Sequence, residues 1–110
     1  MTNKSKLVDL SKLSGRVFIG RPNGREARKY FEIDNLDPET SKIIFKVPEN
    51  TISVNSSFFL GLFAPDILKL KSYEEFFKYV DISDLPERFQ NQLKSAVKRT
   101  LSQNDYGLGR

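Results

Sequence analysis

The segment ISVNSSFFLGLFAPDIL, residues 52–68, contains the strand-to-helix junction that decides the fold. Its first residues alternate in polarity and include β-branched side chains, which is typical of a strand. From Phe58 to Phe63 the chain is apolar on nearly every side of a helix, which predicts a helix buried between other elements. Pro65 is expected to end or kink this helix, because proline lacks the N–H group of a helix interior.

Three polar residues, Asn55, Ser56 and Ser57, occupy the junction itself. Their side chains could cap the helix by accepting hydrogen bonds from its first backbone N–H groups. The same N–H groups and the helix dipole stabilise a phosphate, so a serine here is also a candidate phosphorylation switch. Nucleophilic catalysis by a serine is disfavoured, since the chain contains no His to activate it. These three residues are the candidate interaction or switch site.

The rest of the chain predicts strands that alternate with helices. The strand-like runs are residues 16–20, 42–47, 51–54 and 78–82. The run 42–47, KIIFKV, is continuously apolar between its lysines and is expected to be covered on both faces of a sheet. Capping-box spacings predict helix starts at Asn23 with Glu26, Ser72 with Glu75, and Asp84 with Glu87. This alternation predicts a small α/β layer structure.

The last predicted helix is the clearest, because an apolar stripe follows one of its faces. The stripe consists of Leu85, Phe89, Leu93, Ala96, Val97 and Leu101. Its opposite face is basic and carries Arg88, Lys94, Lys98 and Arg99. The polar, glycine-containing stretch 103–110 is expected to fray beyond the helix.

Length and composition limit the class of protein. A chain of 110 residues with 38% hydrophobic and 29% charged residues predicts one domain over 1–110, with 1–14 as an initial strand or arm. Because His and Cys are absent, disulfides, the usual zinc sites and His-based catalysis are excluded, so we expect a non-enzymatic protein with neither metal nor cofactor. The beginning of the chain does not resemble a signal peptide and no apolar run is long enough for a membrane span, so a cytoplasmic location is expected.

Charge is distributed unevenly along the chain, in a basic–acidic–basic order. Residues 16–29 carry five Lys and Arg against one Glu, and residues 30–87 carry five Lys against eleven acidic residues. In the first basic region Ala27, Tyr30 and Phe31 are predicted to face inward, with Arg25, Arg28 and Lys29 outward. Such a pattern favours a charged partner surface, although solvated helix faces would give it too.

Two groups of residues are therefore candidates for contact with an anion or a partner. The first lies in GRPNGREAR around the start of a helix and the second lies on the C-terminal helix: Arg21, Asn23, Arg25 and Arg28, then Lys94 and Lys98. GRPNGREAR lacks the spacing of dinucleotide-binding and Walker loops, so a simple turn before a solvated helix competes with the anion-binding interpretation. If the two basic faces are coplanar, salt-dependent nucleic-acid binding follows as a hypothesis.

The strand KIIFKV, continued by ISV and followed by NSSFFLGLF, resembles the centre of the sulfate-transporter and anti-sigma-antagonist (STAS) domains. In that family a central strand runs into an Asp-Ser-Ser-Gly-like turn and then a buried helix, and a serine of the turn is a phosphorylation switch. The resemblance places Ser56 at the acceptor serine and Ser57 at the Ser or Thr after it. Asn55 and Phe58 stand where the family has Asp and Gly.

The order of segments is more similar still to a STAS-like domain of unknown function found in small bacterial and mobile-element proteins. The matching segments span about residues 15–102 and are GRPNGREARKYF, KIIFKV, SSFFLGLF and ISDLPERFQNQLKSAVKRTL. The resemblance implies a mixed sheet of about four strands packed against three to four helices, and a regulatory or protein-interaction role.

We accordingly expect a STAS-like module that works by contact with a partner protein. The expected surface combines the start of the helix at Ser56 with the neighbouring Arg21–Arg28 segment, at the strand ends where open α/β sheets bind their ligands. Two alternatives remain: binding of nucleic acid or a nucleotide phosphate through the basic 21–29 and 94–99 faces, and a phage-type inhibitor that uses the acidic middle region.

Overall fold

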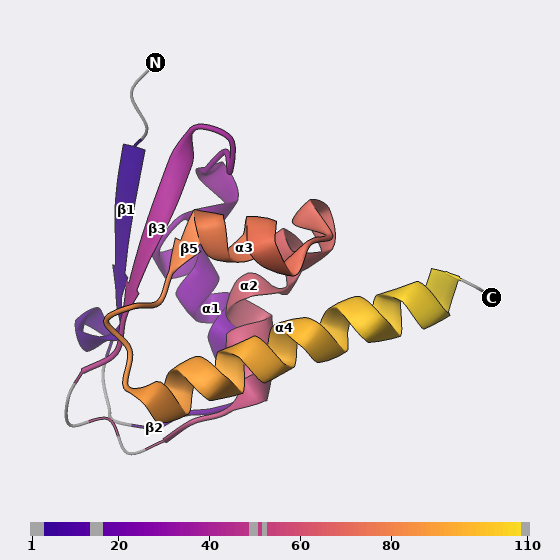
Figure 1. Cartoon of the computed structure of the whole chain (residues 1–110). Helices are drawn as coiled ribbons and strands as arrows, with labels where there is room; N and C mark the ends of the chain where they lie inside the picture. The colour runs from indigo at the N-terminus through magenta and orange to yellow at the C-terminus, as the bar shows by residue number, and fades with distance from the viewer. Residues whose placement is uncertain (1–3, 14–16, 49–50, 52, 109–110) are drawn as a thin grey trace.

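Parallel strands lie along one side of the molecule, and the helices pack against one face of them (Figure 1). The computed structural model describes residues 4–13, 17–48, 51 and 53–108, and the side chains of Val17 and of residues 104–108 are not described. The strands are β1 Lys4–Asp9, β2 Val17–Phe18, β3 Ser41–Lys46, β4 Ser53–Val54 and β5 Val80–Asp81. The helices are α1 Arg21–Tyr30, α2 Ser56–Leu70, α3 Tyr73–Tyr79 and α4 Glu87–Leu108, with short 3-10 turns η1 Leu10–Lys12 and η2 Ile33–Asn35. The predicted α/β class is confirmed.

The strands pair in two groups. One group has the order β1-β3-β5 and the other joins β2 to β4, and every described pair is parallel. Since β2 leads into α1 and β4 leads into α2, both helices begin at the same end of the β2–β4 pair. The initial segment contains strand β1, and the domain limits 1–110 and the frayed tail 103–110 remain predictions.

The sheet formed by β1, β3 and β5 has its buried side chains on one face. In β3 the side chains of Ile43 and Phe45 are fully buried, whereas Lys42 and Lys46 are exposed and Ile44 is half-buried. The prediction that this strand is covered on both faces is therefore wrong. Because side chains alternate along a strand, the two lysines and Ile44 lie together on the opposite face of the sheet, and that face carries the charges.

Helix α2 forms the centre of the core, as predicted for a helix that is apolar on nearly every side. Phe45 of β3 makes edge-to-face contacts with Phe59 and Phe63 of α2 at centroid distances of 6.0 and 5.3 Å, and Phe63 contacts Phe76 of α3 at 5.7 Å. All four rings are fully buried, and each contributes about 1.5–3 kcal/mol of hydrophobic stabilisation.

Pro65 does not end α2, which continues to Leu70 and closes with Lys71 in the left-handed conformation (φ 56°). Of the two outcomes predicted for Pro65, termination is thus ruled out. The helix turn before the proline receives a donor from outside: Nη1 of Arg28 in α1 donates to the carbonyl of Leu62 at 2.8 Å. The hydrogen bond that Pro65 cannot make would end on the carbonyl of Gly61, one residue earlier, so the bond from Arg28 is an additional link between α1 and α2.

Two of the predicted helix starts differ in detail from the structure. Helix α1 begins at Arg21 rather than at an Asn23 cap, because Gly20 turns the chain with φ 93° and Pro22 fits the first turn of a helix. Helix α4 begins at Glu87 rather than Asp84, with two backbone N–H groups donating to the carbonyl of Pro86.

The cap of α3 and the apolar stripe of α4 agree with their predictions. The hydroxyl of Ser72 accepts a hydrogen bond from the N–H group of Glu75 at 3.2 Å. The apolar stripe of α4, together with Leu85 just before the helix, is buried, and only its last residue, Leu101, is half-buried. The buried residues are Leu85, Phe89, Leu93, Ala96 and Val97. Within the described ranges, no helix combines the length and apolar character that crossing a membrane requires.

Candidate functional site

The parallel pair β2–β4 brings the starts of α1 and α2 together. The N–H group of Asn55 donates to the carbonyl of Phe18 at 3.1 Å, and the N–H group of Gly20 donates to the side-chain oxygen of Asn55 at 3.3 Å. Gly20 directly precedes α1 and Asn55 directly precedes α2. The sequence-predicted candidates Asn55 and Arg21 therefore lie close together at the carboxyl end of two parallel strands, where open α/β sheets bind ligands.

Asn55 caps α2. Its Oδ1 atom accepts a hydrogen bond from the N–H group of Phe58 at 3.0 Å, as well as the bond from Gly20. The interpretation that Ser56 or Ser57 supplies the cap is therefore wrong. Ser56 is half-buried and its hydroxyl accepts a hydrogen bond from Nη2 of Arg99 in α4 at 3.2 Å, whereas Ser57 is exposed.

A groove runs between α1 and α2 beside these helix starts. Its volume is about 310 Å³. Basic residues at helical spacing line the α1 side, and small or apolar residues line the α2 side: Arg21, Arg25, Arg28 and Lys29, then Leu60, Gly61, Ala64 and Pro65. Asp34 lies at one end. We call this feature the α1–α2 groove. Its exposed basic residues on the α1 side, Arg21, Arg25 and Lys29, are its rim, and Leu60, Ala64 and Pro65 on the α2 side are its floor.

The groove exists because the backbones of α1 and α2 almost touch at two glycines. A Cβ atom added to Gly24 would lie 2.9 Å from the Cα atom of Gly61, and closer still to the carbonyl oxygen of Phe58. A Cβ added to Gly61 would meet the carbonyl oxygen of Arg21 in the same way. Small residues at a crossing let helices approach closely, and this approach brings the basic α1 side chains against the apolar surface of α2.

Arg28 lies in the interior instead of on the rim, so its predicted outward orientation is wrong. Its relative exposure is 7%, whereas Tyr30, predicted to face inward, is 58% exposed. Nη1 of Arg28 lies 2.7 Å from Asp66 of α2, and Nε lies 2.7 Å from the exposed Asp34. Burial, the largest single effect, lowers the pKa of Arg28, but the hydrogen bonds and charges of Asp66 and Asp34 outweigh it and raise the pKa above its ordinary value.

Position 28 is buried because the contact face of α1 follows the spacing i, i+3, i+4, i+7. The members of this face are Gly24, Ala27, Arg28 and Phe31, and all four are buried. The guanidinium is compensated there by Asp66, which is 5% exposed, and by the Leu62 carbonyl. Arg28 therefore fixes α1 to α2 and is not available to a partner in this conformation.

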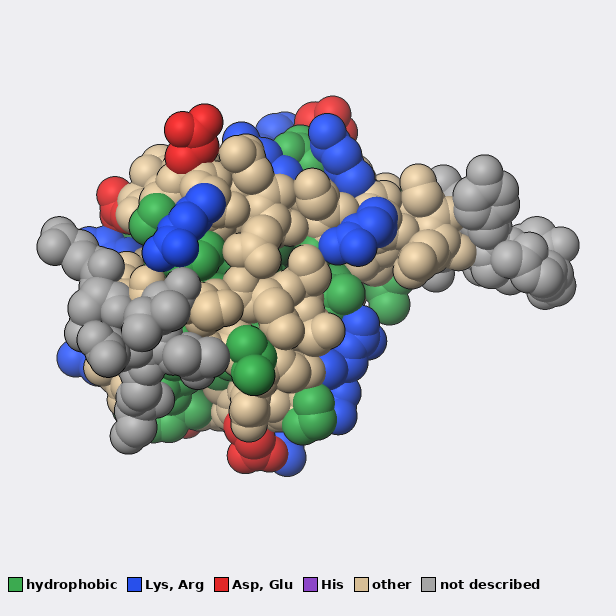
Figure 2. All heavy atoms as spheres, turned by 90° about the horizontal axis from the view of Figure 1, so that it is seen from below, with side chains coloured by type: hydrophobic (Ala, Val, Ile, Leu, Met, Phe, Trp, Pro, Cys, Tyr) green, Lys and Arg blue, Asp and Glu red, His purple; other side chains and the backbone are tan. Residues whose placement is uncertain are grey.

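The remaining rim cations are exposed. In the part of the chain that the structure describes, Arg21 and Arg25 form no ion pair, and Lys29 pairs only with the exposed Glu26 at 3.6 Å. An exposed pair of this kind contributes little and leaves the positive potential largely intact. Seen from below, Lys and Arg side chains gather along one edge of the molecule under the protruding helix α4, with hydrophobic side chains beside them (Figure 2).

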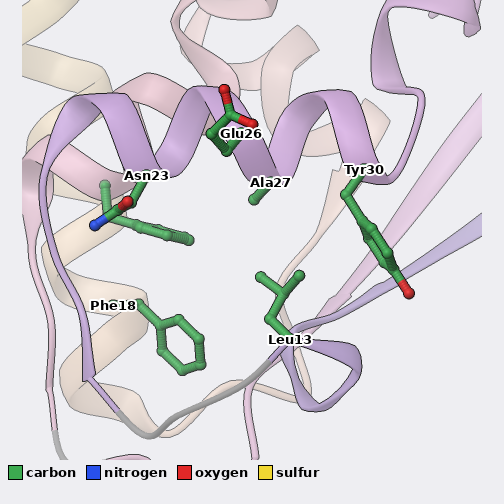
Figure 3. Close-up of a pocket in the computed structure, with 7 residues that line it drawn as sticks. Leu13, Phe18, Asn23, Glu26, Ala27 and Tyr30 are labelled. Atoms are coloured by element: carbon green, nitrogen blue, oxygen red, sulfur yellow. The ribbon is translucent and has the colours of Figure 1, made fainter.

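Asn23 lies on a different side of α1 from the groove. Its side-chain Nδ2 atom donates to the carbonyl of Ile19 at 2.8 Å. With Glu26, Ala27 and Tyr30 it borders a separate cavity of about 430 Å³, into which Leu13 and Phe18 also project (Figure 3). This second cavity has a carboxylate and no cation among its described lining residues, so the structure does not place Asn23 in an anion site with Arg21 and Arg25.

The basic residues of α4 point to two different neighbours. Arg99 contacts Ser56 at the start of α2, and Leu60 lines both the groove and the small hollow beside Arg99. Lys98 instead lies over the ring of Tyr73 at 5.4 Å, and Lys94 lines a hollow against α3 and β5. The structure therefore separates the candidates Lys94 and Lys98 from the Arg21–Arg25 rim.

Neither a metal-binding cluster nor a similar protein indicates a role for this site. Within the described ranges, no cluster of three or more His, Cys, Asp or Glu residues could hold a metal ion. No protein-family model matches the chain, and comparisons with curated proteins and with solved structures likewise gave no match. The α1–α2 groove and its neighbouring serines are thus interpreted from their own geometry.

Proposed function

We propose that this chain is a non-enzymatic, STAS-like regulatory module that binds a partner protein in the α1–α2 groove. The observation that carries the proposal is the combination of an apolar floor with two exposed arginines that have no ion pair among the described residues. A floor of Leu60, Ala64 and Pro65 suits apolar side chains of a partner, and the rim suits acidic residues beside them. The expected partner segment is therefore acidic and amphipathic.

Binding is favoured over catalysis by the chemistry of the groove. Among the described residues that line it there is no hydroxyl or thiol nucleophile, and the one carboxylate, Asp34, is paired with Arg28. A general base needs a free lone pair within reach of a substrate proton. The arrangement instead provides complementary charge and buried apolar surface, which is what a docking site requires. We also propose that the protein acts in the cytoplasm.

Ser56 and Ser57 supply a means of regulation in a hollow that shares Leu60 with the groove. Leu60 lies one helical turn from Ser56 and Ser57, and the three residues line the same hollow beside Arg99. A phosphoryl group on either serine would add about −1.5 to −2 charges there. An acidic partner would be repelled by this charge, so phosphorylation is expected to weaken binding. Replacing Ser57 with Asp should reproduce the effect and replacing it with Ala should not.

The test compares two charge-reversed variants. Arg21→Glu/Arg25→Glu reverses the rim, and Lys94→Glu/Lys98→Glu makes the same change in net charge on the α3 side of α4. A helical peptide with Leu on one face and Glu on the other should shift the ¹H–¹⁵N resonances of Leu60, Gly61 and Ala64 in the wild-type protein. The rim variant should lose this binding at least tenfold, and the α4 variant should keep it. Equal loss in both variants would contradict the proposal.

Nucleic-acid binding is the second candidate, favoured by the unpaired state of Arg21 and Arg25 among the described residues. Binding of this kind depends on the number of phosphates neutralised and falls steeply with salt. Fluorescence anisotropy with a single-stranded oligonucleotide at low salt separates the candidates. A nucleic-acid protein should bind the oligonucleotide and ignore the leucine face of the peptide, and a protein-binding module should do the reverse.

A further inference from the structure

Strand β1 is an edge of the β1-β3-β5 sheet and is the longer of its two edge strands. Its six residues pair along one side with β3, whereas the other edge, β5, has two residues. Among the described residues, no strand pairs with the outer side of β1, and Figure 1 shows β1 at the margin of the molecule. An unpaired strand edge is a template for pairing with another chain.

The backbone groups on this free side can be assigned from the pairing. The N–H group of Lys4 donates to the carbonyl of Thr40 at 2.9 Å, toward β3. Because the N–H and C=O groups of alternate residues point to opposite sides of a strand, Lys6 and Val8 also point toward β3. The groups of Ser5 and Leu7, and the N–H group of Asp9, therefore point outward.

Leu7 is the most informative residue of this edge. Its side chain is 47% exposed, on the face of the sheet opposite the buried Ile43 and Phe45. The register places it beside the half-buried Ile44 of β3 on the same face. A short apolar ridge thus leads from the sheet toward its free edge and stops there.

We propose that two copies of this chain associate through β1, in antiparallel pairing about a twofold axis at Leu7. Leu7 then lies opposite Leu7 of the second copy, and their side chains extend the ridge into one continuous row with both Ile44 residues. Ser5 lies opposite Asp9 of the second copy, where its hydroxyl can donate to the carboxylate. The two three-stranded sheets become one sheet of six strands.

A second copy is favoured as the occupant because the edge is self-complementary in the register centred on Leu7. Pairing centred on Lys6 would instead place two like charges opposite each other and leave Leu7 against Ser5, which is unfavourable. The interface is small, and each chain carries a net charge of +4 with Lys4 and Lys6 on the pairing strand. The association is therefore weak, at micromolar concentrations or above, and strengthens with salt as the charges are screened.

The test uses the absence of native cysteine. Leu7→Cys places a single thiol on the twofold axis, where paired Cα atoms lie about 5.5 Å apart, within the range of a disulfide. Leu68→Cys is the matched control, because Leu68 is also an exposed leucine (40%) but lies on α2. Under mild oxidation Leu7→Cys should form a covalent dimer at least tenfold faster than Leu68→Cys, and faster still at higher salt. A mixture of Ser5→Cys and Asp9→Cys chains should give the mixed dimer that the register requires.

Sedimentation equilibrium of the unmodified protein gives an independent reading. The wild-type chain should show a reversible monomer–dimer equilibrium, and Leu7→Lys should shift it at least tenfold toward monomer with an unchanged thermal midpoint. Equal linking rates for the two cysteine variants would overturn the proposal, as would a wild-type chain that stays monomeric into the millimolar range. The groove is not involved, because Leu7 is not among its lining residues.

Discussion

The glycine crossing of α1 and α2 makes a strong prediction about Gly61→Ala. In most helices this change stabilises, because alanine is favoured over glycine by about 1 kcal/mol. Here the added Cβ would lie 2.9 Å from both the backbone nitrogen of Arg25 and the Cα of Gly24, and nearer still to the Arg21 carbonyl oxygen. Ordinary contact begins at 3.4 Å, so the helices must separate by at least about 0.5 Å.

The cost of that separation exceeds the gain in helix propensity. All three contacting atoms belong to the backbone, so no side-chain rotation can relieve them. Overpacking of this kind costs about 3 kcal/mol at the upper end of its usual range, which leaves a net loss of about 2 kcal/mol. In urea unfolding followed by circular dichroism, the midpoint should fall by about 1 M. The loss from Ala64→Gly, one turn along α2, calibrates the propensity effect in this helix.

A double-mutant cycle tests the mechanism as well as the size of the effect. Once either glycine is replaced the helices have already moved apart, so Gly24→Ala/Gly61→Ala should cost clearly less than the sum of the two single changes. The expected coupling is about 0.5–3 kcal/mol. A Gly61→Ala protein as stable as the wild type would refute the close crossing, and strictly additive losses would refute the shared separation.

Three further changes test the buried polar groups. Arg28→Met should cost about 3–5 kcal/mol, because it leaves the carboxylate of Asp66 buried without its partner, and Arg28→Met/Asp66→Leu should cost less than the single change in the same urea assay. Asn55→Ala should cost about 1–2 kcal/mol in thermal or urea unfolding, since two backbone N–H groups lose their acceptor. Burial, with a smaller effect from Asp66, raises the pKa of Tyr79 to about 12, so ionisation of this hydroxyl costs no stability below about pH 10 and lowers the stability of the fold as pH rises from about 10 to 12. Tyr79→Phe should therefore reduce the loss of stability between pH 10 and 12 and change little at pH 7, where this hydroxyl has no hydrogen-bond partner in the described structure.

The architecture was largely predictable because it follows from local patterns. The apolar circumference of Phe58–Phe63, the stripe of α4 and the Ser72 cap each depend on residues within a few positions of one another, and the structure contains all three. The two-sided cover of residues 42–47 failed for a different reason. Ile43 and Ile44 lie on opposite faces, so whether Ile44 is covered depends on which helices reach that face, which no local pattern encodes.

The candidate site was predictable only in part. Asn55, Ser56 and Arg21 were identified because a junction of strand and helix has a sequence signature, and the structure brings Asn55 and Arg21 to the same end of the β2–β4 pair. The groove floor at Leu60 and Ala64 was missed, since both residues read as ordinary core positions. Glycines inside two predicted helices were the available signal, because glycine is unfavourable in a helix unless another backbone approaches it.

Arg28 connects the stability of the fold to the shape of the groove. Its guanidinium bonds to Asp66 and to the Leu62 carbonyl, so it holds α1 against the turn of α2 that precedes Pro65. That same turn presents the apolar floor, and the exposed Arg25 and Arg21, one and two turns away on α1, form the rim. A buried ion pair adds little net stability compared with apolar side chains, but it restricts the partners to one geometry. If this restriction is what Arg28 supplies, then Arg28→Met/Asp66→Leu should recover much of the stability yet bind the acidic peptide more weakly than the wild type. Full binding by that double variant would show that the glycine crossing alone sets the groove.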